Sequence, residues 1–481
     1  MKMIVGHVWT YIDGAWPRGI LDRVTSYEVE GKWFVSSYKK GHWDGRERFI
    51  KYDQSRKQHF FPTGLLNRVT SALDMSGYPY QLWDERSYEI PEPVLALHPN
   101  IKLDVGKYSY QGAGVQTALG IGRGILKVAT GGGKTEMAAA IIASLNRPTL
   151  WLTHLLTLLE QTASRLEERL QEKVGRISGE VFDPKRITVA TIQTFARNTS
   201  RKADIEKLAR SVEVVIGDEI HHLEAAEWYE VFSKIQAPWR FGLSATPCIT
   251  GPGMALVGMT GEVIYEVTPT QLMDIGVLAK PRIWFVSVDQ PKLPKKTDFH
   301  SVYRQGIVNN EFRNEMVRRV AASFKEEGKP TLILVKMIEH GEILENLLNR
   351  CGIRAEFLSG KDWESTRQDS IRRLSEGRIQ AIIATRIFNE GKDIPCVRAV
   401  INATGSKGGG NAKEGDSGRV TIQVLGRGTR TSDGKDSFDY VDFSDKTHKF
   451  LMQASLARVE TLELEGYAQF IKPWARYGLD I

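Results

Sequence analysis

The feature that most constrains the fold is an alternation, along most of the chain, between short apolar β-branched runs and longer stretches of helical pattern. In the first region, about residues 100–285, the predicted strands are 124–128, 149–152, 187–190 and 212–216. In the second region, about residues 286–450, they are 331–335, 379–384, 399–402 and 438–441. Parallel strands need crossover connections, which are usually helices. We therefore predict an α/β fold with two tandem parallel-sheet domains.

The N-terminal region has a different pattern. Residues 1–95 hold five of the eleven tryptophans, among short alternating segments such as 32–38 that predict half-buried strands. Apolar side chains at helical spacing predict one helix over 63–75, which the Gly-Tyr-Pro sequence at 77–79 ends before a last strand at 81–83. We predict a small β-rich accessory domain.

These patterns divide the chain into four parts. We expect the accessory domain at 1–95, the two α/β domains at 96–285 and 286–450, and a helical tail at 451–481. Within the second α/β domain, residues 404–419 contain six glycines and almost no apolar side chains, which predicts a loop. This loop either touches DNA or is a plain insertion, and the pattern fits both.

Charge and cysteine content narrow the class of protein. Lys and Arg number 65 against 58 Asp and Glu, and this net charge of +7 mildly favours an anionic partner. The three cysteines lie far apart without a CxxC pair, so we expect neither a disulfide framework nor a structural metal site. No apolar run reaches the ~18 residues of a membrane span. We expect a cytoplasmic monomer that does not enter membranes.

The strongest local signal is the segment 128–135, Val-Ala-Thr-Gly-Gly-Gly-Lys-Thr, between a predicted strand and the helix-forming residues 136–145. Glycines let backbone N–H groups turn toward phosphate oxygens, and the helix N-terminus favours negative charge. Lys134 can reach the β- and γ-phosphates of a nucleotide, and Thr135 can hold Mg²⁺. The candidate cradle residues are Thr130, Gly131, Gly132, Gly133, Lys134 and Thr135. The alternative is a glycine-rich turn, because Val128 replaces the first glycine of the usual pattern.

A second signal is the acidic pair Asp218-Glu219, directly after the predicted strand 212–216. Carboxylates at the carboxyl end of a strand lie where open α/β sheets bind ligands. Asp218 can hold Mg²⁺ through water, and Glu219 can polarise the water that attacks the γ-phosphate. Alone, the pair could also be an ordinary acidic loop.

In this order, the phosphate loop, Asp-Glu-Ile-His at 218–221, Ser-Ala-Thr-Pro at 244–247 and Gln-Val-Leu-Gly-Arg-Gly-Thr-Arg at 423–430 resemble the motifs of superfamily 2 DNA helicases. The resemblance implies two RecA-like domains with ATP and Mg²⁺ in the cleft between them. It assigns Arg427 and Arg430 to the γ-phosphate of ATP and Gln423 to the attacking water. Arginines that reach a γ-phosphate suit the charge of phosphoryl transfer.

The same resemblance assigns roles to smaller motifs. Tyr110 and Gln111 match the pair that contacts adenine, although such a dipeptide alone is more often surface or core. The candidates for contact with the nucleic acid backbone, or for coupling that contact to ATP, are His154, Thr191, Gln193, Ser244, Thr246, Ser359 and Thr385. Helix caps explain any single Thr or Ser among them equally well. The segment Glu-Gly-Lys-Asp-Ile-Pro at 390–395 matches a further coupling element.

Within the superfamily, Asn309, Asn310, Arg313 and Asn314, together with Thr447-His448, Arg458 and Tyr467, resemble the phage UvsW and RecG-like branch-migration helicases. That resemblance implies an ATP-dependent DNA helicase or translocase that reverses forks, migrates junctions and unwinds duplexes in replication, recombination or repair. It also implies a bacterial or phage-infected cell. The alternatives are an RNA helicase, a double-stranded DNA translocase that does not unwind, and a binding protein whose ATPase is a switch.

The accessory domain also carries a basic, aromatic segment. Residues 32–57 hold eight basic and three acidic side chains, interleaved with aromatic ones. Basic groups neutralise phosphates and aromatic rings stack on exposed bases. We predict DNA binding here, while aromatic residues in a small β domain are also its usual core.

Overall fold

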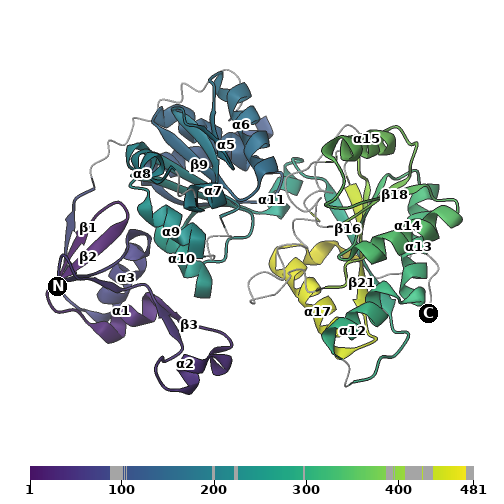
Figure 1. The fold of residues 1–481 in the computed structure, drawn as a ribbon, viewed down its shortest axis with the longest axis horizontal. Coiled ribbons are helices and arrows are strands. Elements are labelled where there is room, and N and C mark those ends of the chain that lie inside the picture. The colour runs from purple at the N-terminus through teal and green to yellow at the C-terminus, as the bar shows by residue number, and fades with distance from the viewer. Residues whose placement is uncertain are drawn as a thin grey trace. The chain divides into compact units, whose positions relative to one another are not determined.

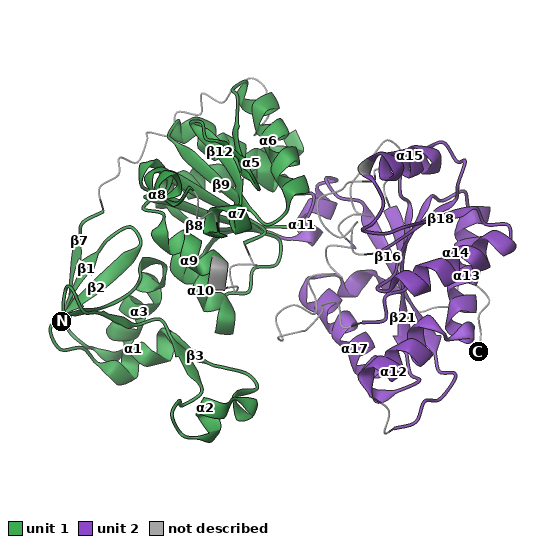
Figure 2. Ribbon diagram, viewed as in Figure 1, with its two compact units in different colours: residues 1–129, 133–267 green, residues 130–132, 268–481 purple. Residues whose placement is uncertain are grey.

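A computed structural model of the chain describes residues 1–86, 101, 103, 106–197, 201–220, 226–295, 298–385, 394, 396–406, 425 and 437–472. The chain divides into two compact units (Figure 2). Unit 1 comprises Met1–Ala129 and Gly133–Val267, and unit 2 comprises Thr130–Gly132 and Thr268–Ile481.

Unit 1 begins with a five-stranded sheet in the order β5-β6-β2-β1-β7 (Figure 1). All neighbours in it are antiparallel except β1 and β7, which are parallel. Its strands are β1 (Lys2–Val5), β2 (Trp9–Asp13), β5 (Lys51–Asp53), β6 (Gln58–Pro62) and β7 (Gln81–Asp84). Helix α1 (Arg18–Val24) and a second, two-stranded sheet of β3 (Ser26–Glu28) and β4 (Arg46–Arg48) are inserted between β2 and β5.

The helix predicted at 63–75 is present as a 3₁₀ turn, η2 (Thr63–Leu65), followed by α3 (Leu66–Ser76). Its apolar side chains Val69 and Leu73 are buried, and Gly77, at φ +66°, ends it. A left-handed glycine at this position is a common helix terminator because it has no Cβ to clash. Helix α3 is amphipathic, as its spacing predicts.

The prediction of a strand over 32–38 is wrong. These residues form a 3₁₀ turn, η1 (Lys32–Phe34), and the short helix α2 (Ser36–Lys39). Trp33, Phe34 and Val35 are exposed, so the alternation of side chains has no buried face to fix it. Strand register depends on such a face.

The second part of unit 1 is an eight-stranded sheet in the order β11-β10-β12-β9-β13-β14-β8-β15, in which only β11 is antiparallel. Its strands are β8 (Arg123–Val128), β9 (Thr149–Thr153), β10 (Gly175–Ser178), β11 (Val181–Asp183), β12 (Ile187–Thr191), β13 (Val214–Asp218), β14 (Trp239–Ser244) and β15 (Val263–Val267). The helical elements around it are η3 (Gly106–Tyr108), α4 (Ser109–Ile121), α5 (Lys134–Leu145), α6 (Leu156–Leu170), α7 (Ile192–Arg197), α8 (Lys202–Ser211), α9 (Ala226–Lys234), η5 (Gly251–Gly253) and α10 (Met254–Thr260) (Figure 1). The four strands predicted in this region all overlap observed ones.

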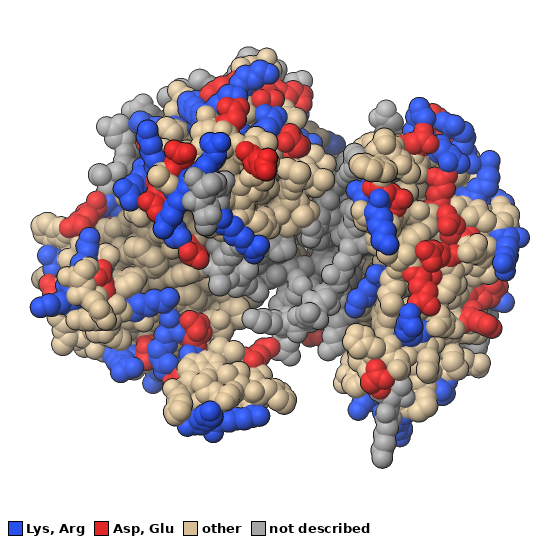
Figure 3. Space-filling view, in the orientation of Figure 1, with Lys and Arg blue, Asp and Glu red and all other residues tan. Residues whose placement is uncertain are grey.

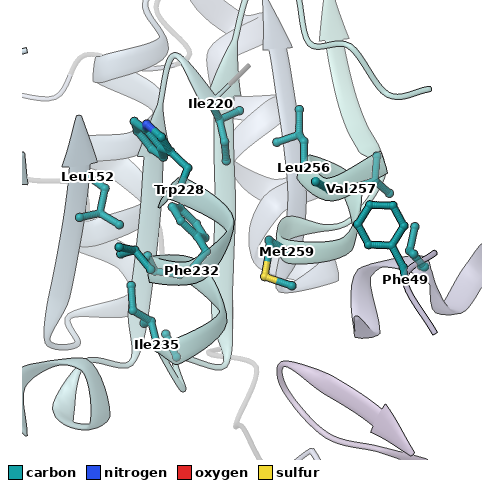
Figure 4. Close-up of a cluster of buried hydrophobic side chains, with 14 of the residues drawn as sticks. Phe49, Leu152, Ile220, Trp228, Phe232, Ile235, Leu256, Val257 and Met259 are labelled. Atoms are coloured by element: carbon teal, nitrogen blue, oxygen red, sulfur yellow. The ribbon is translucent and has the colours of Figure 1, made fainter. Parts of the chain in front are cut away.

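One hydrophobic core joins the two parts of unit 1. Phe49, Phe61 and Leu65 of the first part are buried in the same cluster as Leu256 and Val257 of α10. Figure 4 shows Phe49 beside Val257. Close approach is needed here: a Cβ at residue 64 would lie 1.9 Å from the Val257 carbonyl oxygen. The small sheet is therefore fixed to the parallel sheet by a packed interface.

A salt bridge adds a polar contact to this interface. The Arg68 guanidinium of α3 donates to both carboxylate oxygens of Glu262, at 2.6 and 3.0 Å, and to the Ile249 carbonyl oxygen at 3.0 Å. Bidentate pairs of this kind fix geometry as well as adding energy. Arg68 thus links the small sheet to the segment that follows Ser-Ala-Thr-Pro at 244–247.

Unit 2 contains a seven-stranded parallel sheet in the order β18-β19-β17-β20-β21-β16-β22. Its strands are β16 (Lys280–Val288), β17 (Thr331–Leu334), β18 (Ala355–Leu358), β19 (Ala381–Ala384), β20 (Ala399–Asn402), β21 (Ser437–Asp445) and β22 (Ile471–Lys472). Its helical elements are α11 (Pro269–Asp274), α12 (Phe299–Tyr303), the π-helical turn η6 (Arg304–Val308), α13 (Glu311–Glu326), α14 (Ile338–Arg350), α15 (Glu364–Ser375), α17 (Lys449–Leu464) and η8 (Ala468–Phe470). The prediction of an α/β fold with two parallel sheets and a small β-rich N-terminal region is confirmed.

Helix α13 shows how local sequence sets an element in unit 2. The Asn310 side chain accepts a hydrogen bond from the Arg313 N–H and caps the helix. Met316, Val317, Val320 and Phe324 are buried on its inner face. The N-cap satisfies a backbone donor that has no partner within the helix.

A fully buried charge network links α13 and α17 to β21 in unit 2. Arg458 of α17 donates to both oxygens of Asp442 at 3.1 Å, and Arg313 donates to Asp445 Oδ1 at 2.8 Å. The same guanidinium groups donate to the carbonyl oxygens of Ser406 and Ala403. The network therefore holds the chain just beyond β20 as well as the end of β21.

Candidate active site

The phosphate loop lies between β8 and α5, as predicted. Gly131 and Gly133 adopt φ values of +85° and +83°, which glycine tolerates and side chains disfavour. Lys134 is the first residue of α5, and its Nζ lies 3.4 Å from the Val128 carbonyl oxygen, across the loop. The loop thus places a lysine and a helix N-terminus at one point, which is the arrangement that binds phosphate.

The acidic pair faces this loop. Asp218 ends β13, and Lys134 Nζ lies 3.8 Å from Glu219 Oε1. Glu219 has φ +47°, an uncommon value for a residue with a side chain, and its N–H donates to Asp218 Oδ1 at 3.0 Å. Backbone strain of this kind clusters at functional sites. The structure therefore brings Lys134 together with Asp218 and Glu219, which lie 84 and 85 residues further along the chain.

The pKa of Asp218 differs from that of an ordinary aspartate. Burial, and next the negative charge of Glu219, raise the pKa of Asp218 to about 6, while Lys134 opposes the shift. At neutral pH this carboxylate is ionised although burial and the Glu219 charge disfavour its negative charge. A bound cation would therefore stabilise it. Asp218 and the Thr135 hydroxyl are hard oxygen ligands, and Mg²⁺ commonly takes one or two such protein ligands beside substrate phosphates. The donor set fits Mg²⁺-ATP.

Tyr110 and Gln111 lie next to the phosphate loop. Gln111 is buried on α4, and its Nε2 donates to the Tyr110 hydroxyl at 3.3 Å. A Cβ at residue 133 would lie 2.2 Å from Gln111 Nε2, so this amide packs directly against Gly133. Tyr265 of β15 donates to the Tyr110 carbonyl oxygen at 2.7 Å and fixes the start of the helix.

The remaining candidates of unit 1 follow the same edge of the sheet. Thr153 and Thr191 are paired in register at the ends of β9 and β12, and Gln193 Nε2 donates to the His154 carbonyl oxygen at 3.2 Å. Ser244 ends β14, where its Oγ accepts from the Thr246 N–H at 3.2 Å. Carboxyl ends of parallel strands share one edge, and open α/β sheets bind ligands there.

In unit 2, two candidates also share a strand edge. Ser359 follows β18, and its Oγ donates to Asp362 Oδ2 at 3.0 Å. Thr385 follows β19, and its N–H donates to the Leu358 carbonyl oxygen at 3.3 Å. Gln423, Arg427 and Arg430, as well as His221, most of 390–395 and the loop from residue 407 onward, lie outside the described residues.

Sequence reasoning missed the contacts that Arg68 makes. Its partner Glu262 is 194 residues away, and the chain between them carries no signal for the pairing. The sequence motifs likewise give no sign that Gln111 packs against Gly133, because that contact depends on how α4 lies on α5. Only the fold brings these pairs together.

These observations define a class: a phosphate-loop ATPase built on parallel α/β sheets. Family models narrow it, since residues 108–249 match the Type III restriction enzyme, res subunit, and residues 313–432 match the helicase conserved C-terminal domain. The chain belongs to the superfamily 2 helicases, which are ATP-dependent enzymes acting on nucleic acid. The resemblance of the motifs to this superfamily is confirmed.

Individual relatives agree with this assignment. Putative helicase 22 of Sulfolobus islandicus filamentous virus is 24% identical over 374 residues, 72% of this chain and 64% of the relative. The ATP-dependent DNA helicase uvsW of Enterobacteria phage T4 is 22% identical over 440 residues, 85% of this chain and 83% of the relative. A fragment of a putative HsdR subunit of a type I restriction enzyme from Vibrio vulnificus has a similar fold, with 17% identity, a TM-score of 0.54 and coverage of 82% of this chain and 73% of that one.

Among the described residues, no helix is both long and apolar enough to span a bilayer.

The raised pKa of Asp218 gives a testable consequence for stability. The folded value of about 6 lies above the ordinary 3.8, so the folded state binds more protons between these values and loses stability as pH rises through them. Above pH 6 the ionised Asp218 carboxylate lowers the free energy of unfolding by its full amount. The substitution Asp218→Asn should remove this loss of stability. We expect the variant to be about 1–3 kcal/mol more stable than the wild type at pH 8 without Mg²⁺ or nucleotide, and inactive as an ATPase.

Thermal unfolding in the presence of a chelator, at pH 8 and at pH 4.5, measures the difference in stability between Asp218→Asn and the wild type. The gain should shrink at the lower pH, and Asp13→Asn, at an exposed position, should show no gain at either. A variant less stable than the wild type at pH 8, or a gain independent of pH, would contradict the electrostatic account.

Proposed function

We propose that this helicase is a DNA motor that remodels branched DNA, by fork reversal, junction branch migration and duplex unwinding, in replication, recombination or repair. The observation that carries the proposal is the small N-terminal sheet packed into the core of the motor unit, through Phe49, Leu65 and the Arg68–Glu262 pair. An accessory domain fixed in this way moves with the motor. The phage T4 DNA helicase, which is similar over 85% of this chain, supports DNA as the substrate.

In the proposed reaction, the Thr130–Thr135 loop cradles the phosphates of ATP and Lys134 neutralises charge on the β- and γ-phosphates. Mg²⁺, held by Thr135 and Asp218, would supply further positive charge there. Glu219, 3.8 Å from Lys134, orients the attacking water. Tyr110 and Gln111 hold the adenine. We propose Gln423, Arg427 and Arg430 for the attacking water and the γ-phosphate on the strength of the family motif.

Nucleic acid would lie along the strand ends that carry His154, Thr191, Gln193, Ser359 and Thr385. Hydroxyl and amide groups there suit phosphate oxygens and carry no base specificity. Ser244 and Thr246 lie beside the acidic pair, because β14 is the neighbour of β13 on the side opposite β9 and β12. Their proposed role is to transmit nucleic acid contact to the ATP site.

The rate of ATP hydrolysis on different nucleic acids tests the substrate class. At equal nucleotide concentrations, we expect a four-way junction to stimulate hydrolysis more than single-stranded DNA, plain duplex DNA or structured RNA. Lys134→Ala serves as the blank. The greatest stimulation by RNA would indicate an RNA helicase, and equal stimulation by duplex and junction would indicate a translocase that does not unwind; either result would overturn the branched-DNA proposal.

A further inference from the structure

The accessory domain exposes three consecutive apolar residues, Trp33, Phe34 and Val35, here called the aromatic tip. Trp33 is 61% and Phe34 84% exposed. The tip lies at the end of the small two-stranded sheet of β3 and β4, in the turn η1 just before α2 (Figure 1). Large apolar side chains held in water at the end of a projection mark an interaction site.

The tip is rigid rather than a loose loop. The Trp33 and Tyr38 rings pack edge to face with their centres 5.2 Å apart, and the centres of the Tyr38 and Trp43 rings are 6.4 Å apart. Trp43 Nε1 donates a hydrogen bond to the Arg46 carbonyl oxygen at 2.9 Å. Lys32 Nζ lies 4.9 Å from the centre of the Trp33 ring. The ring of Trp33 is therefore fixed in place before any ligand arrives.

The base of the projection is attached to the motor. Phe49, directly after β4, is buried in the core of unit 1 (Figure 4). The centre of its ring lies 6.1 Å from that of the Tyr229 ring on α9. The Phe49 N–H donates to the Thr25 carbonyl oxygen at 2.9 Å, which closes the projection at its root. A ligand on the tip is thus mechanically linked to the ATP-binding sheet.

The distribution of charged side chains around the tip favours a nucleic acid base as its ligand. The cations Arg46, Arg48 and Lys32 are engaged by Glu28, Asp22 and Asp44. Lys39 and Lys40 are exposed, and none of the described ion pairs uses them. Figure 3 shows an uncharged surface around α2 with basic side chains at its outer end. This is an aromatic platform with one or two phosphate contacts, unlike a basic groove that follows a duplex.

The size of the tip also argues against a protein partner. A stable protein interface buries about 800 Å² on each side. Each large aromatic side chain buries only about 150–250 Å², so the two rings of the tip, at about 300–500 Å² together, fall well short. An unpaired base, in contrast, is covered by a single ring.

We propose that the aromatic tip stacks on the unpaired bases beside a DNA branch point. The inference rests on the proposed function, because it supplies the contact by which a DNA motor would recognise the branch. Stacking is tolerant of sequence, since every base has a π-face. It also contributes little to counterion release, so its share of the affinity is insensitive to salt.

Binding of the full-length chain to a synthetic fork, without nucleotide, tests the proposal. The fork carries 2-aminopurine at the unpaired positions next to the branch. Trp33→Ala combined with Phe34→Ala should weaken binding about 5- to 100-fold, by the same factor at low and high salt, and should abolish the quenching of 2-aminopurine fluorescence. Binding to a fully paired, blunt-ended duplex should not change.

Trp83 offers a matched control. It is 58% exposed on β7 and lies 4.5 Å below the Lys2 ammonium, much as Trp33 lies below Lys32. Trp83→Ala should leave fork binding and quenching unchanged, and Trp33→Phe should retain most of both. Unchanged fork binding by the double variant, or an equal loss in Trp83→Ala, would overturn the proposal. So would a double variant that alters only self-association in sedimentation, which would assign the tip to a second copy of the chain.

The two proposals fail in different ways. If no nucleic acid stimulates ATP hydrolysis, the proposed motor function fails while the nucleotide-free stacking signal stands. If junctions stimulate hydrolysis but the double variant binds forks normally, only the role of the tip fails.

Discussion

Lys134→Ala is expected to lower ATP hydrolysis at least ~10²-fold, the scale on which one preorganised positive group contributes to stabilising a charged transition state. Lys134 is the cation that joins the phosphate loop to the acidic pair, with Nζ 3.4 Å from the Val128 carbonyl oxygen and 3.8 Å from Glu219 Oε1. Nucleic acid binding should persist, because the proposed backbone contacts come from other strands. Steady-state hydrolysis with a junction at saturation measures the effect.

The matched control is Lys127→Ala. Lys127 lies on β8, close to the same loop, but its Nζ pairs with the Glu266 carboxylate of the edge strand β15 at 2.8 Å. Its removal should change the rate less than twofold. Hydrolysis by Lys134→Ala within a fewfold of the wild type would contradict the assigned site.

The same variant separates a motor from a switch. A motor without hydrolysis keeps DNA binding and loses strand movement. A binding protein that uses its ATPase only as a switch keeps its effect on DNA without turnover.

Arg458→Met is expected to destabilise unit 2 by about 3–5 kcal/mol, the usual cost of removing one partner from a buried ion pair. Arg458 is fully buried and is held by Asp442, Ser406 and Phe443. Without it, Asp445 keeps the Arg313 guanidinium, while the described contacts give Asp442 no other guanidinium partner. Burial already raises the pKa of Asp445, so the loss of a cation would raise it further.

Hydrogen exchange of the β20 and β21 amides reports the stability of this region, because both strands border the network. Arg319→Met, on the exposed side of α13, is the control and should cost less than about 1 kcal/mol. Adding Asp442→Asn to Arg458→Met should recover part of the loss. A cost below about 1 kcal/mol for Arg458→Met would show that the network contributes little.

Much of the fold was predictable because its signals are local. The phosphate loop depends on consecutive glycines before a helix, and the strand ends that carry Asp218 and Ser244 follow continuous apolar runs. A parallel sheet then gathers these ends at one edge, whatever the loops between them do. The candidate ATP site in unit 1 follows from those two facts.

The rest depends on contacts between distant residues. The strand predicted at 438–441 extends to Asp445 in the structure. The sequence pattern ends it before Asp442, because carboxylates are rarely buried, but Arg313 and Arg458 neutralise these carboxylates in the fold. The turn at Trp33 replaces a predicted strand since no core covers it. The Arg68–Glu262 pair joins elements that no periodicity relates.

The most direct test of the central claim is conversion of a synthetic four-way junction with homologous arms into two duplex products. The account predicts that the wild-type chain, with ATP and Mg²⁺, converts the junction, while Lys134→Ala binds it and leaves it intact. Failure of the wild type to convert a junction that stimulates its ATPase, or conversion by Lys134→Ala, would contradict the claim that ATP hydrolysis drives branch migration.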